Sequence, residues 1–276
     1  MEQNSKEILP ARYLNDHIKA DTREDGRDFL SFRPVSVNVG SIKNADSSAV
    51  CRIGNTGAVC GIKAELGPPH ADAPDVGIIL PIIELSGLCS QRFRPGLPNE
   101  EAMCIAKIVE DILINSKAID LTDLCIHKGK LVWILNCQIM CTNADGAVVD
   151  CCIAALMAAL KNLTVQKVEY TPESNEFKKD PVERVSIPLK QMSIRTSFAL
   201  LKDDLLIADP TSFEEDMATS MLSLAYNEKN EIVYLHKPGG DPISDTLLKK
   251  AMSKAKSHTE QIRTLISTAQ STVGKK

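Results

Sequence analysis

This sequence lacks the features of several common protein classes. It has no apolar run of about 18 residues, the length that a transmembrane helix needs. Its charged first stretch, residues 1–20, contains no apolar core of a secretory signal. The formal net charge is -4, so the chain as a whole is not a polycation. Any contact with nucleic acid must therefore come from a local basic patch or from an assembly.

The spacing of the nine cysteines does not fit the usual metal sites. No CxxC pair occurs, and the five histidines form neither an HxxxH nor a CxxC…H spacing. Cys137 and Cys141 flank an apolar run, while Cys151 and Cys152 are adjacent. This placement is typical of small buried hydrophobic residues in a reducing compartment. We therefore expect no metal, no cofactor and no contact with a membrane.

A length of 276 residues is enough for about two domains. Both halves show several strands followed by a helix, which predicts an α+β protein of two similar lobes, with mixed or antiparallel sheets and packed helices. The polar, proline-flanked segment 171–181 has the composition of a linker. The predicted organisation is an N-terminal helical extension and turn (1–30), a first lobe (31–168), a linker and first strand (169–191), and a second lobe with a C-terminal helix (192–276).

The first half contains clear local signals. The charged segment Arg23–Arg27 forms a turn after a helical lead-in, and Gly54-Asn55 is the turn of a hairpin. Asn99, followed by two glutamates, begins an amphipathic helix. The apolar run Leu131–Cys141 predicts a strand buried on both faces, and Asp150–Leu160 predicts a helix of small residues packed closely on a sheet.

The second half repeats the strand signals and ends in a helix. The turn Lys237–Gly240 lacks the glycine spacing of a phosphate-binding loop and leads into a helix capped near Ser244. The strands expected before that helix are Val182–Leu189, Thr196–Leu201, Leu205–Ala208, Ala218–Tyr226 and Ile232–His236.

Short motifs along almost the whole chain carry a family resemblance. They are Arg23-Glu-Asp-Gly-Arg27, Gly54-Asn-Thr56, the Pro-Gly and Glu-Glu start of the first long helix, Leu124-Cys-Ile, Gly129-Lys130-Leu-Val-Trp133, Asp145-Gly146, Asp150, Thr196-Ser-Phe198, Asp209-Pro-Thr211 and Glu214-Glu215. No single motif is specific, but their order and spacing resemble the RNase PH family. Within it, the chain is most similar to the non-catalytic ring subunits of the eukaryotic RNA exosome.

The resemblance implies an RNase PH-like fold of the ribosomal-protein-like superfold, and a place in a hexameric ring that threads single-stranded RNA. The implied partners are the other RNase PH-like ring subunits and the KH-type cap proteins. The implied processes are 3'-to-5' RNA degradation, rRNA maturation and mRNA turnover, in the nucleus with its nucleolus and in the cytoplasm.

The resemblance also locates a reaction centre. Active members cleave RNA with phosphate, held by a Gly-Thr-Arg or Gly-Thr-Ser-like triplet at a helix start. Here the triplet falls on Ala147, Val148 and Val149, and each lost donor typically costs about 100- to 1000-fold in rate. Asp209 matches the first carboxylate of the active pattern, whereas Glu215 stands where the second is an aspartate. The resemblance therefore implies a degenerate site without catalytic residues.

Other interpretations stay open at this point. Asp209 could still serve an active, phosphate-dependent 3'-to-5' exoribonuclease, or the chain could be an α+β module with no link to RNA decay. Arg92 and Arg94 lie in a loop that faces the channel in the family, where they would contact RNA phosphates; the alternative is solvated or interfacial ion pairs.

The remaining charged motifs favour structural roles. We expect the Arg23–Arg27 segment to be a salt-linked turn. Asp209, Glu214 and Glu215 are expected to serve as helix-start acids and as part of an interface network.

Overall fold

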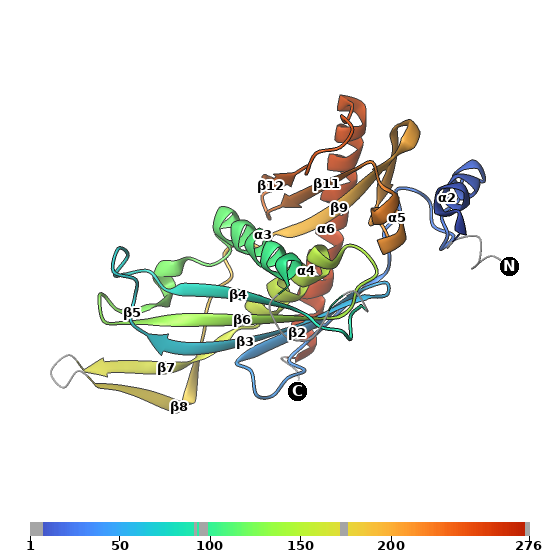
Figure 1. Cartoon of the computed structure of the whole chain (residues 1–276). Coiled ribbons are helices and arrows are strands. Elements are labelled where there is room, and N and C mark those ends of the chain that lie inside the picture. Colours follow the sequence, from blue (N-terminus) through green and yellow to red (C-terminus); the bar gives the residue numbers. More distant parts are fainter. Residues whose placement is uncertain (1–7, 91–92, 94–98, 172–175, 274–276) are drawn as a thin grey trace.

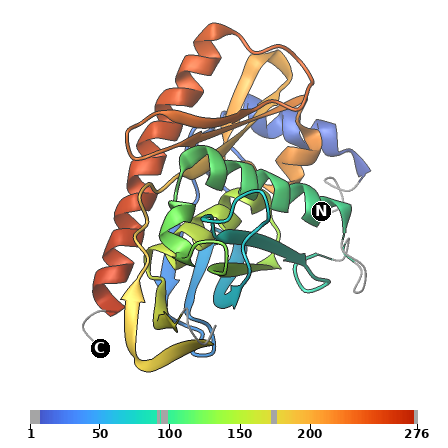
Figure 2. The same ribbon diagram turned by 90° about the vertical axis from the view of Figure 1, so that its left-hand side faces the viewer.

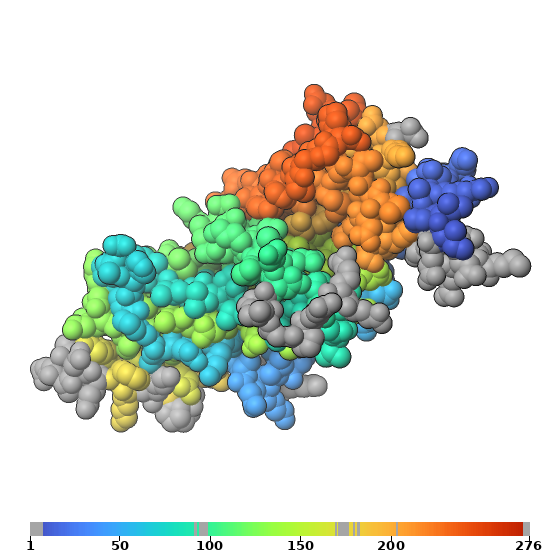
Figure 3. Space-filling view, viewed as in Figure 1, coloured from blue at the N-terminus to red at the C-terminus, as the bar shows by residue number. Residues whose placement is uncertain are grey.

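The structure, a computed structural model, describes residues 8–90, 93, 99–171 and 176–273 of the 276-residue chain (Figure 1). Two lobes lie side by side, and the long C-terminal helix α6 (Asp245–Val273) runs along both of them (Figure 2). The space-filling view shows one elongated body with the N-terminal segment at one end (Figure 3). No helix in the described part of the chain is both long and apolar enough to cross a membrane.

The first lobe is built on a six-stranded sheet of order β1-β2-β3-β6-β4, with β5 paired to β6. Its strands are β1 (Val35–Val39), β2 (Ser47–Ile53), β3 (Thr56–Gly67), β4 (Ile78–Leu85), β5 (Cys125–His127) and β6 (Leu131–Asn143). β4 runs parallel to β6, and the other pairs are antiparallel. The predicted hairpin turn at Gly54-Asn55 is confirmed, because it joins β2 to β3.

Strand β6 differs from its prediction. Its side chains alternate between a buried face with Leu135, Cys137 and Ile139, and an outer face on which Gln138 and Met140 are exposed. The prediction of a strand buried on both faces was therefore wrong. Its apolar run includes Ile134 and Met140, which lie on the outer face of the sheet. An apolar side chain in this strand is therefore not always a buried one.

Two helices cover the inner face of this sheet. α3 (Glu100–Ser116) begins as predicted after Asn99, whose side chain accepts a hydrogen bond from the Glu101 N–H at 3.3 Å. The predicted small-residue helix is confirmed as α4 (Val148–Lys161), in which every residue from 150 to 160 is buried. Its alanines and cysteines allow close contact with β2 and β3 on one side and with the second lobe on the other.

The second lobe carries an antiparallel four-stranded sheet of order β10-β9-β11-β12. Its elements are β9 (Ile194–Leu201), β10 (Leu205–Ala208), α5 (Ser212–Met217), β11 (Ser220–Tyr226) and β12 (Ile232–His236), with a short 3-10 helix at Lys202–Asp204. The other short 3-10 helix, Leu121–Leu124, precedes β5 in the first lobe. Ile194 and Ala225 of this sheet and Ile262 of α6 belong to the same core as the first sheet. The two lobes therefore share part of one hydrophobic core, while Phe198 and Leu224 of the second sheet belong to a separate cluster with Ala251 of α6.

The segment predicted as a linker forms part of a hairpin instead. β7 (Thr164–Thr171) pairs antiparallel with β8 (Glu176–Ser186), so the strand expected from Val182 begins six residues earlier, at Glu176. A two-stranded ribbon accommodates Pro181 because its strands are edges, where a missing N–H is tolerated. Polar composition and proline therefore mimicked a linker.

The helical extension is described from residue 8 onwards. It forms α2 (Pro10–Lys19), which lies at the end of the second lobe beside α5 (Figure 1). Leu14 and Ile18 pack against Ala199, Leu201 and Ile207 of the second sheet. The extension thus belongs in space to the second lobe, although it precedes the first lobe in sequence.

Candidate functional site

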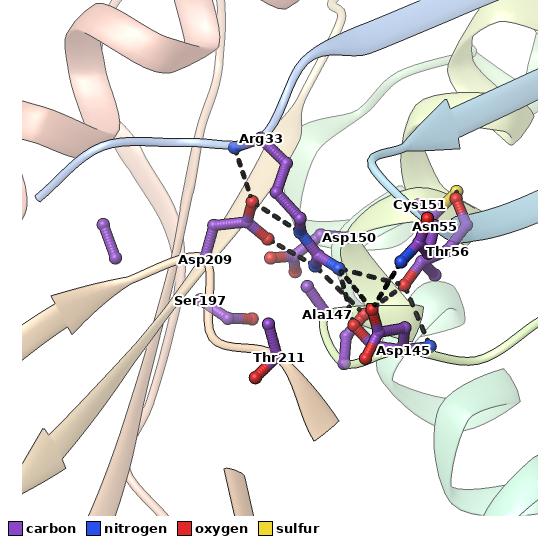
Figure 4. Close-up of polar contacts among 12 residues, drawn as sticks. Arg33, Asn55, Thr56, Asp145, Ala147, Asp150, Cys151, Ser197, Asp209 and Thr211 are labelled. Atoms are coloured by element: carbon purple, nitrogen blue, oxygen red, sulfur yellow. Dashed lines mark hydrogen bonds and ion pairs between the residues drawn. The ribbon is translucent and has the colours of Figure 1, made fainter. Parts of the chain in front are cut away.

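A buried ion pair joins the two lobes near the start of α4. Arg33, just before β1, donates from Nη2 to Oδ1 of Asp209 at 2.7 Å. Nε and the backbone N–H of Arg33 donate to Oδ2 at 2.9 and 2.8 Å (Figure 4). Arg27 adds a bond from Nη1 to Oδ2 at 3.3 Å. Both carboxylate oxygens of Asp209, the acid predicted to match the active pattern, are thus occupied.

The environment of Asp209 makes it a poor base. The residue is only 4% exposed, and burial by itself would raise the pKa of its carboxyl. The hydrogen bonds and charge of Arg33 outweigh burial and hold the pKa below its ordinary value. A carboxylate that is fully bonded and weakly basic is poorly suited to accept a proton from a substrate.

The turn Arg23–Arg27 is a salt-linked structural element, as predicted. Arg27 Nε donates to Asp25 at 2.6 Å. Arg23, 3% exposed, donates from Nε and Nη2 to Glu214 at 2.8 and 2.5 Å and from Nη1 to the Ala208 carbonyl at 2.8 Å. The turn therefore fixes the N-terminal segment onto the start of α5.

A tight turn of Asp145, Gly146 and Ala147 precedes α4. Arg33 Nη1 donates to the Asp145 carbonyl at 2.6 Å, and the Thr56 hydroxyl donates to the Gly146 carbonyl at 2.7 Å. Gly146 has φ 74 and Ala147 has φ 50, both in the left-handed region. A Cβ on Gly146 would lie 2.3 Å from the carbonyl oxygen of Pro210, so only glycine allows this approach of the second lobe.

The positions predicted to lack phosphate donors lie directly after this turn. Ala147 is the N-cap residue of α4 and contributes no side-chain cap, while Val148 and Val149 begin the helix. Both valines are partly buried and pack against the hydrophobic core. Their side chains stabilise the lobe and offer no hydrogen-bond donor.

Glu215 of α5 reaches the same helix end. Its Oε1 accepts a hydrogen bond from the Ala147 N–H at 2.8 Å. Burial raises the pKa of Glu215 to about 7; the bond from Ala147 opposes this shift, and the nearby Asp150 carboxylate adds to it. The second acid of the predicted pattern is therefore a cap on the helix.

A second buried ion pair lies one turn further along α4. Asp150 accepts a bond from Nη1 of Arg195, a residue of β9. Arg195 also donates to the hydroxyls of Ser197 and Ser223 at 2.8 and 2.5 Å. The start of α4 is thus tied to the second sheet through side chains as well as through the core.

The outer side of the site is an open cleft of 480 Å³. It is lined by Glu24, Asp25, Arg27, Arg33, Pro34, Gly54, Asn55, Asp145, Thr211, Ser212, Phe213 and Glu214. Both of its arginines are already bound to acids of the chain. Among the described residues, no group of three or more histidine, cysteine or acidic side chains is placed to hold a metal.

The structure brings together most of the predicted positions but not all. Glu215, Val148 and Val149 meet at the start of α4, and Arg33 joins Asp209 to the turn before that helix. Arg92 and Arg94 lie outside the described residues. Sequence reasoning missed Arg33 and Arg195. Their partners are 176 and 45 residues away, and neither arginine stands in a motif that would mark it.

Comparisons with known proteins agree over nearly the whole chain. Domain 1 of the 3' exoribonuclease family, RNase_PH, matches residues 31–166, and domain 2 matches residues 191–258. The exosome complex component rrp43 of Schizosaccharomyces pombe is 37% identical over 259 residues, covering 91% of this chain and 93% of that protein. The exosome complex component Rrp42 of Saccharolobus islandicus is 36% identical over 243 residues, covering 88% and 87%.

Solved structures give the same result. The Archaeoglobus fulgidus exosome with RNA bound to the active site has a chain that superposes with a TM-score of 0.80 at 28% identity, covering 91% of this chain and 95% of that one. An archaeal exosome core chain superposes with a TM-score of 0.77 at 25% identity, covering 95% and 100%. The predicted α+β, RNase PH-like fold is confirmed.

The sequence motifs and the relatives carry the names of different members of the family. The Asp209-Pro-Thr211 motif and the turn Lys237–Gly240 look most like exosome component eight, whereas the relatives above are named Rrp43 and Rrp42. Both family domains and the curated relatives cover most of the chain. The chain therefore belongs to the RNase PH family and is an RNase PH-like exosome ring subunit.

Proposed function

We propose that this chain is a catalytically silent subunit of the exosome ring, which helps to form the RNA path and binds neighbouring subunits. The observation that carries the proposal is the state of Asp209. Its two carboxylate oxygens are held by Arg33 and Arg27, next to a helix start whose Val148 and Val149 offer no side-chain donor. Phosphorolysis needs both a phosphate site and a free acid or base.

The surface supports a role in assembly. β4 is an edge strand of the first sheet, and its Leu80 and Ile82 are 44% and 50% exposed. An exposed aliphatic edge strand favours association, so its coverage by a neighbour is expected. A closed ring of different subunits uses two different surfaces on each protomer. The net charge of -4 supports an RNA affinity shared among subunits.

The finer features of the proposal follow from the resemblance. The neighbours would be other RNase PH-like ring subunits, with KH-type cap proteins on one face of the ring. The complex would act in rRNA maturation and mRNA turnover in the nucleus, the nucleolus and the cytoplasm. The proteins that co-purify with the tagged chain from fractionated cells test this: recovery without any ring subunit would contradict it.

Catalytic silence has a direct test. The purified chain, alone and in a reconstituted ring, is incubated with labelled RNA and inorganic phosphate, and nucleoside diphosphates are measured. We expect no release attributable to this chain, and no difference between wild type, Asp209→Asn and the exposed control Asp72→Asn. Robust release that Asp209→Asn abolishes and Asp72→Asn preserves would establish the rival function, an active exoribonuclease.

The RNA affinity of the isolated chain distinguishes a ring subunit from a protein that binds RNA on its own. We expect the isolated chain to bind single-stranded RNA weakly at physiological salt, with tighter binding after assembly. Tight binding by the monomer would contradict the proposal.

A further inference from the structure

The exposed side of α6 carries a strip of lysines and serines, which we call the α6 strip. Five exposed residues form it: Lys249, Ser253, Lys254, Lys256 and Ser257. The opposite side of the helix packs on the second sheet through Ala251 and Ala255. The helix itself runs along one edge of the molecule (Figure 2), so a ligand can approach the strip from solvent.

Helical spacing brings the five side chains into one surface. Residues three or four apart are neighbours on a helix. Ser253 therefore lies beside Lys249 and Lys256, and Ser257 lies beside Lys254. The helix rises by about 10 Å over the length of the strip. The result is a short row of two hydroxyls with ammonium groups on both sides of it.

The strip has no partners within the described part of the chain. Its three lysines make no ion pair with a described acid, and its two serine hydroxyls make no hydrogen bond to a described residue. Exposed lysines elsewhere do reach acids: Lys63 contacts Glu65 at 3.0 Å, and Lys107 contacts Glu110 at 2.9 Å. Because the three ammonium groups repel one another, their grouping on one helix does not stabilise the fold.

The charges around the strip leave it positive. Two acids, Asp245 and Glu260, stand one turn beyond its ends, and neither lies within ion-pair distance of a strip lysine. Lys250, in the same stretch, does not belong to the strip. It lines a cleft of 420 Å³ in which three carboxylates offset its charge, those of Asp21, Asp28 and Asp204.

The chemistry of the strip fits the phosphate backbone of a nucleic acid better than it fits an acidic protein. Lysine ammonium groups and serine hydroxyls are both common donors to phosphate oxygens. Protein interfaces instead rely on apolar and aromatic anchors at their centre, and the strip contains none. Without an aromatic side chain it cannot stack on bases either, so its contact with a strand does not depend on sequence.

We propose that the α6 strip binds the phosphate backbone of RNA, as a contact on the exposed side of the second lobe. The inference goes beyond the proposed function, because it adds a surface that holds RNA outside the site at the start of α4. Three lysines give a contact with a slope of about -2 in log affinity against log salt for a single strand. Raising the salt from about 50 to about 200 mM should therefore weaken this contact roughly 20-fold.

The test measures RNA affinity and its salt dependence together. A labelled single-stranded RNA is titrated by fluorescence anisotropy with the full-length chain and with the reconstituted ring, at several salt concentrations. The strip variant replaces Lys249, Lys254 and Lys256 with alanine. A second variant replaces the same three with arginine, which keeps the charge.

A matched control removes the same charge elsewhere. It replaces with alanine three exposed lysines that are bound to acids, namely Lys63, Lys107 and Lys128. Alanine is favourable in a helix and the strip is exposed, so the strip variant should fold, which thermal unfolding verifies.

We expect the strip variant to bind RNA at least about tenfold more weakly than wild type at about 50 mM salt, with a slope shallower by about 2. The control should stay within about threefold of wild type, and the arginine variant should keep the wild-type slope. Oligo(A) and oligo(U) should bind equally well.

Four results would overturn the inference. An equal loss in the control would trace the effect to net charge alone. Unchanged affinity of the strip variant in the reconstituted ring would show that assembly covers the strip. A clear preference between oligo(A) and oligo(U) would contradict a backbone contact. An oligoglutamate peptide that loses its binding in the strip variant, while RNA keeps its own, would assign the strip to an acidic protein.

The two proposals fail separately. An unchanged RNA affinity of the strip variant removes the role of α6 and leaves catalytic silence intact. Release of nucleoside diphosphates that depends on Asp209 overturns catalytic silence and leaves the α6 strip in place.

Discussion

Arg33 and Asp209 are 176 residues apart in sequence, and in the fold the guanidinium of one contacts both carboxylate oxygens of the other, at 2.7 and 2.9 Å. Arg33 also bonds the carbonyl of Asp145 at 2.6 Å. One side chain thus links the N-terminal segment, the turn before α4 and the second sheet. Asp209, the acid that the family resemblance matches to the active pattern, is here part of the structural connection between the lobes.

Breaking this pair should strongly destabilise the protein. Arg33→Ala leaves the buried carboxylate of Asp209 without its main partner. Removing one side of a buried ion pair lowers the free energy of unfolding by about 3–5 kcal/mol. Equilibrium unfolding in urea measures it. Lys63→Ala, which removes an exposed pair with Glu65, is the control and should change little. A loss for Arg33→Ala as small as that of the control would show that the pair is not structural.

The double variant Arg33→Met with Asp209→Leu separates pairing from burial. Since it leaves no uncompensated charge, it should be more stable than either single replacement. If the double variant lowers the free energy of unfolding by the sum of the two single effects, the two side chains act independently.

Glu215 should give stability an unusual dependence on pH. Its pKa is about 7 in the folded protein against 4.5 for the free group, so folding favours the protonated form. The stability that it contributes is present below pH 4.5 and is lost as pH rises through 7. Glu215→Gln stays neutral and can still accept from Ala147. Its free energy of unfolding should therefore exceed that of wild type by roughly 1 kcal/mol near pH 5, rising to roughly 3 kcal/mol near pH 8.

Unfolding free energies of both proteins at several pH values test this. The exposed replacement Glu228→Gln should follow the wild-type curve. Parallel curves for Glu215→Gln and wild type would show that the carboxyl is not perturbed. The pH dependence of stability that comes from Asp209 has the opposite sign. Its pKa is lowered in the folded protein, so the stability that it contributes is lost as the pH falls through the range of an ordinary aspartate and below.

Gly146 should be far more sensitive to substitution than Gly129. Both have φ 74, so alanine meets the same backbone strain at either position, about 1–2 kcal/mol. At Gly129 a Cβ would have nothing within 4 Å, whereas at Gly146 it would lie 2.3 Å from the Pro210 carbonyl. We expect Gly146→Ala to lower the free energy of unfolding by at least about 2 kcal/mol more than Gly129→Ala does, as measured by thermal or urea unfolding. Equal losses would contradict the tight contact.

The cysteines should react very unequally with an alkylating reagent. Cys104 is exposed and Cys125 is partly exposed, while the other seven are buried. Burial raises the pKa of the Cys137 thiol to about 12, which also suppresses the reactive thiolate. Brief labelling of the native protein should modify Cys104 first, and the denatured protein should react at all nine positions. Rapid labelling of Cys137 in the native state would contradict the packing of α4 on the sheet.

Local patterns in the sequence predicted much of the fold. The cap at Asn99, the hairpin at Gly54-Asn55 and the small-residue helix α4 were all correct, because each depends on neighbours in the chain. The β7–β8 hairpin was missed, since its pairing produces no apolar stripe and its tip has the composition of a linker. The exposed face of β6 was missed because it carries apolar side chains, of which Met140 is exposed and Ile134 only partly buried.

The candidate site could be predicted in part. Family resemblance located Val148, Val149 and the acids, but it could not show what each acid contacts. The partner of Asp209 is Arg33 and that of Glu215 is the backbone of Ala147. Such pairs depend on how two distant segments meet, and neither periodicity nor spacing carries that information.

The shared core has a consequence for the order in which the protein can form. During synthesis the first lobe leaves the ribosome before β9 and α6 exist, so the side of α4 that later meets β9 has no cover. Arg33 and Asp150 lack their partners at that stage. We therefore expect the nascent first half to bind chaperones until the last helix is made, and truncated chains to be degraded instead of accumulating as half-subunits.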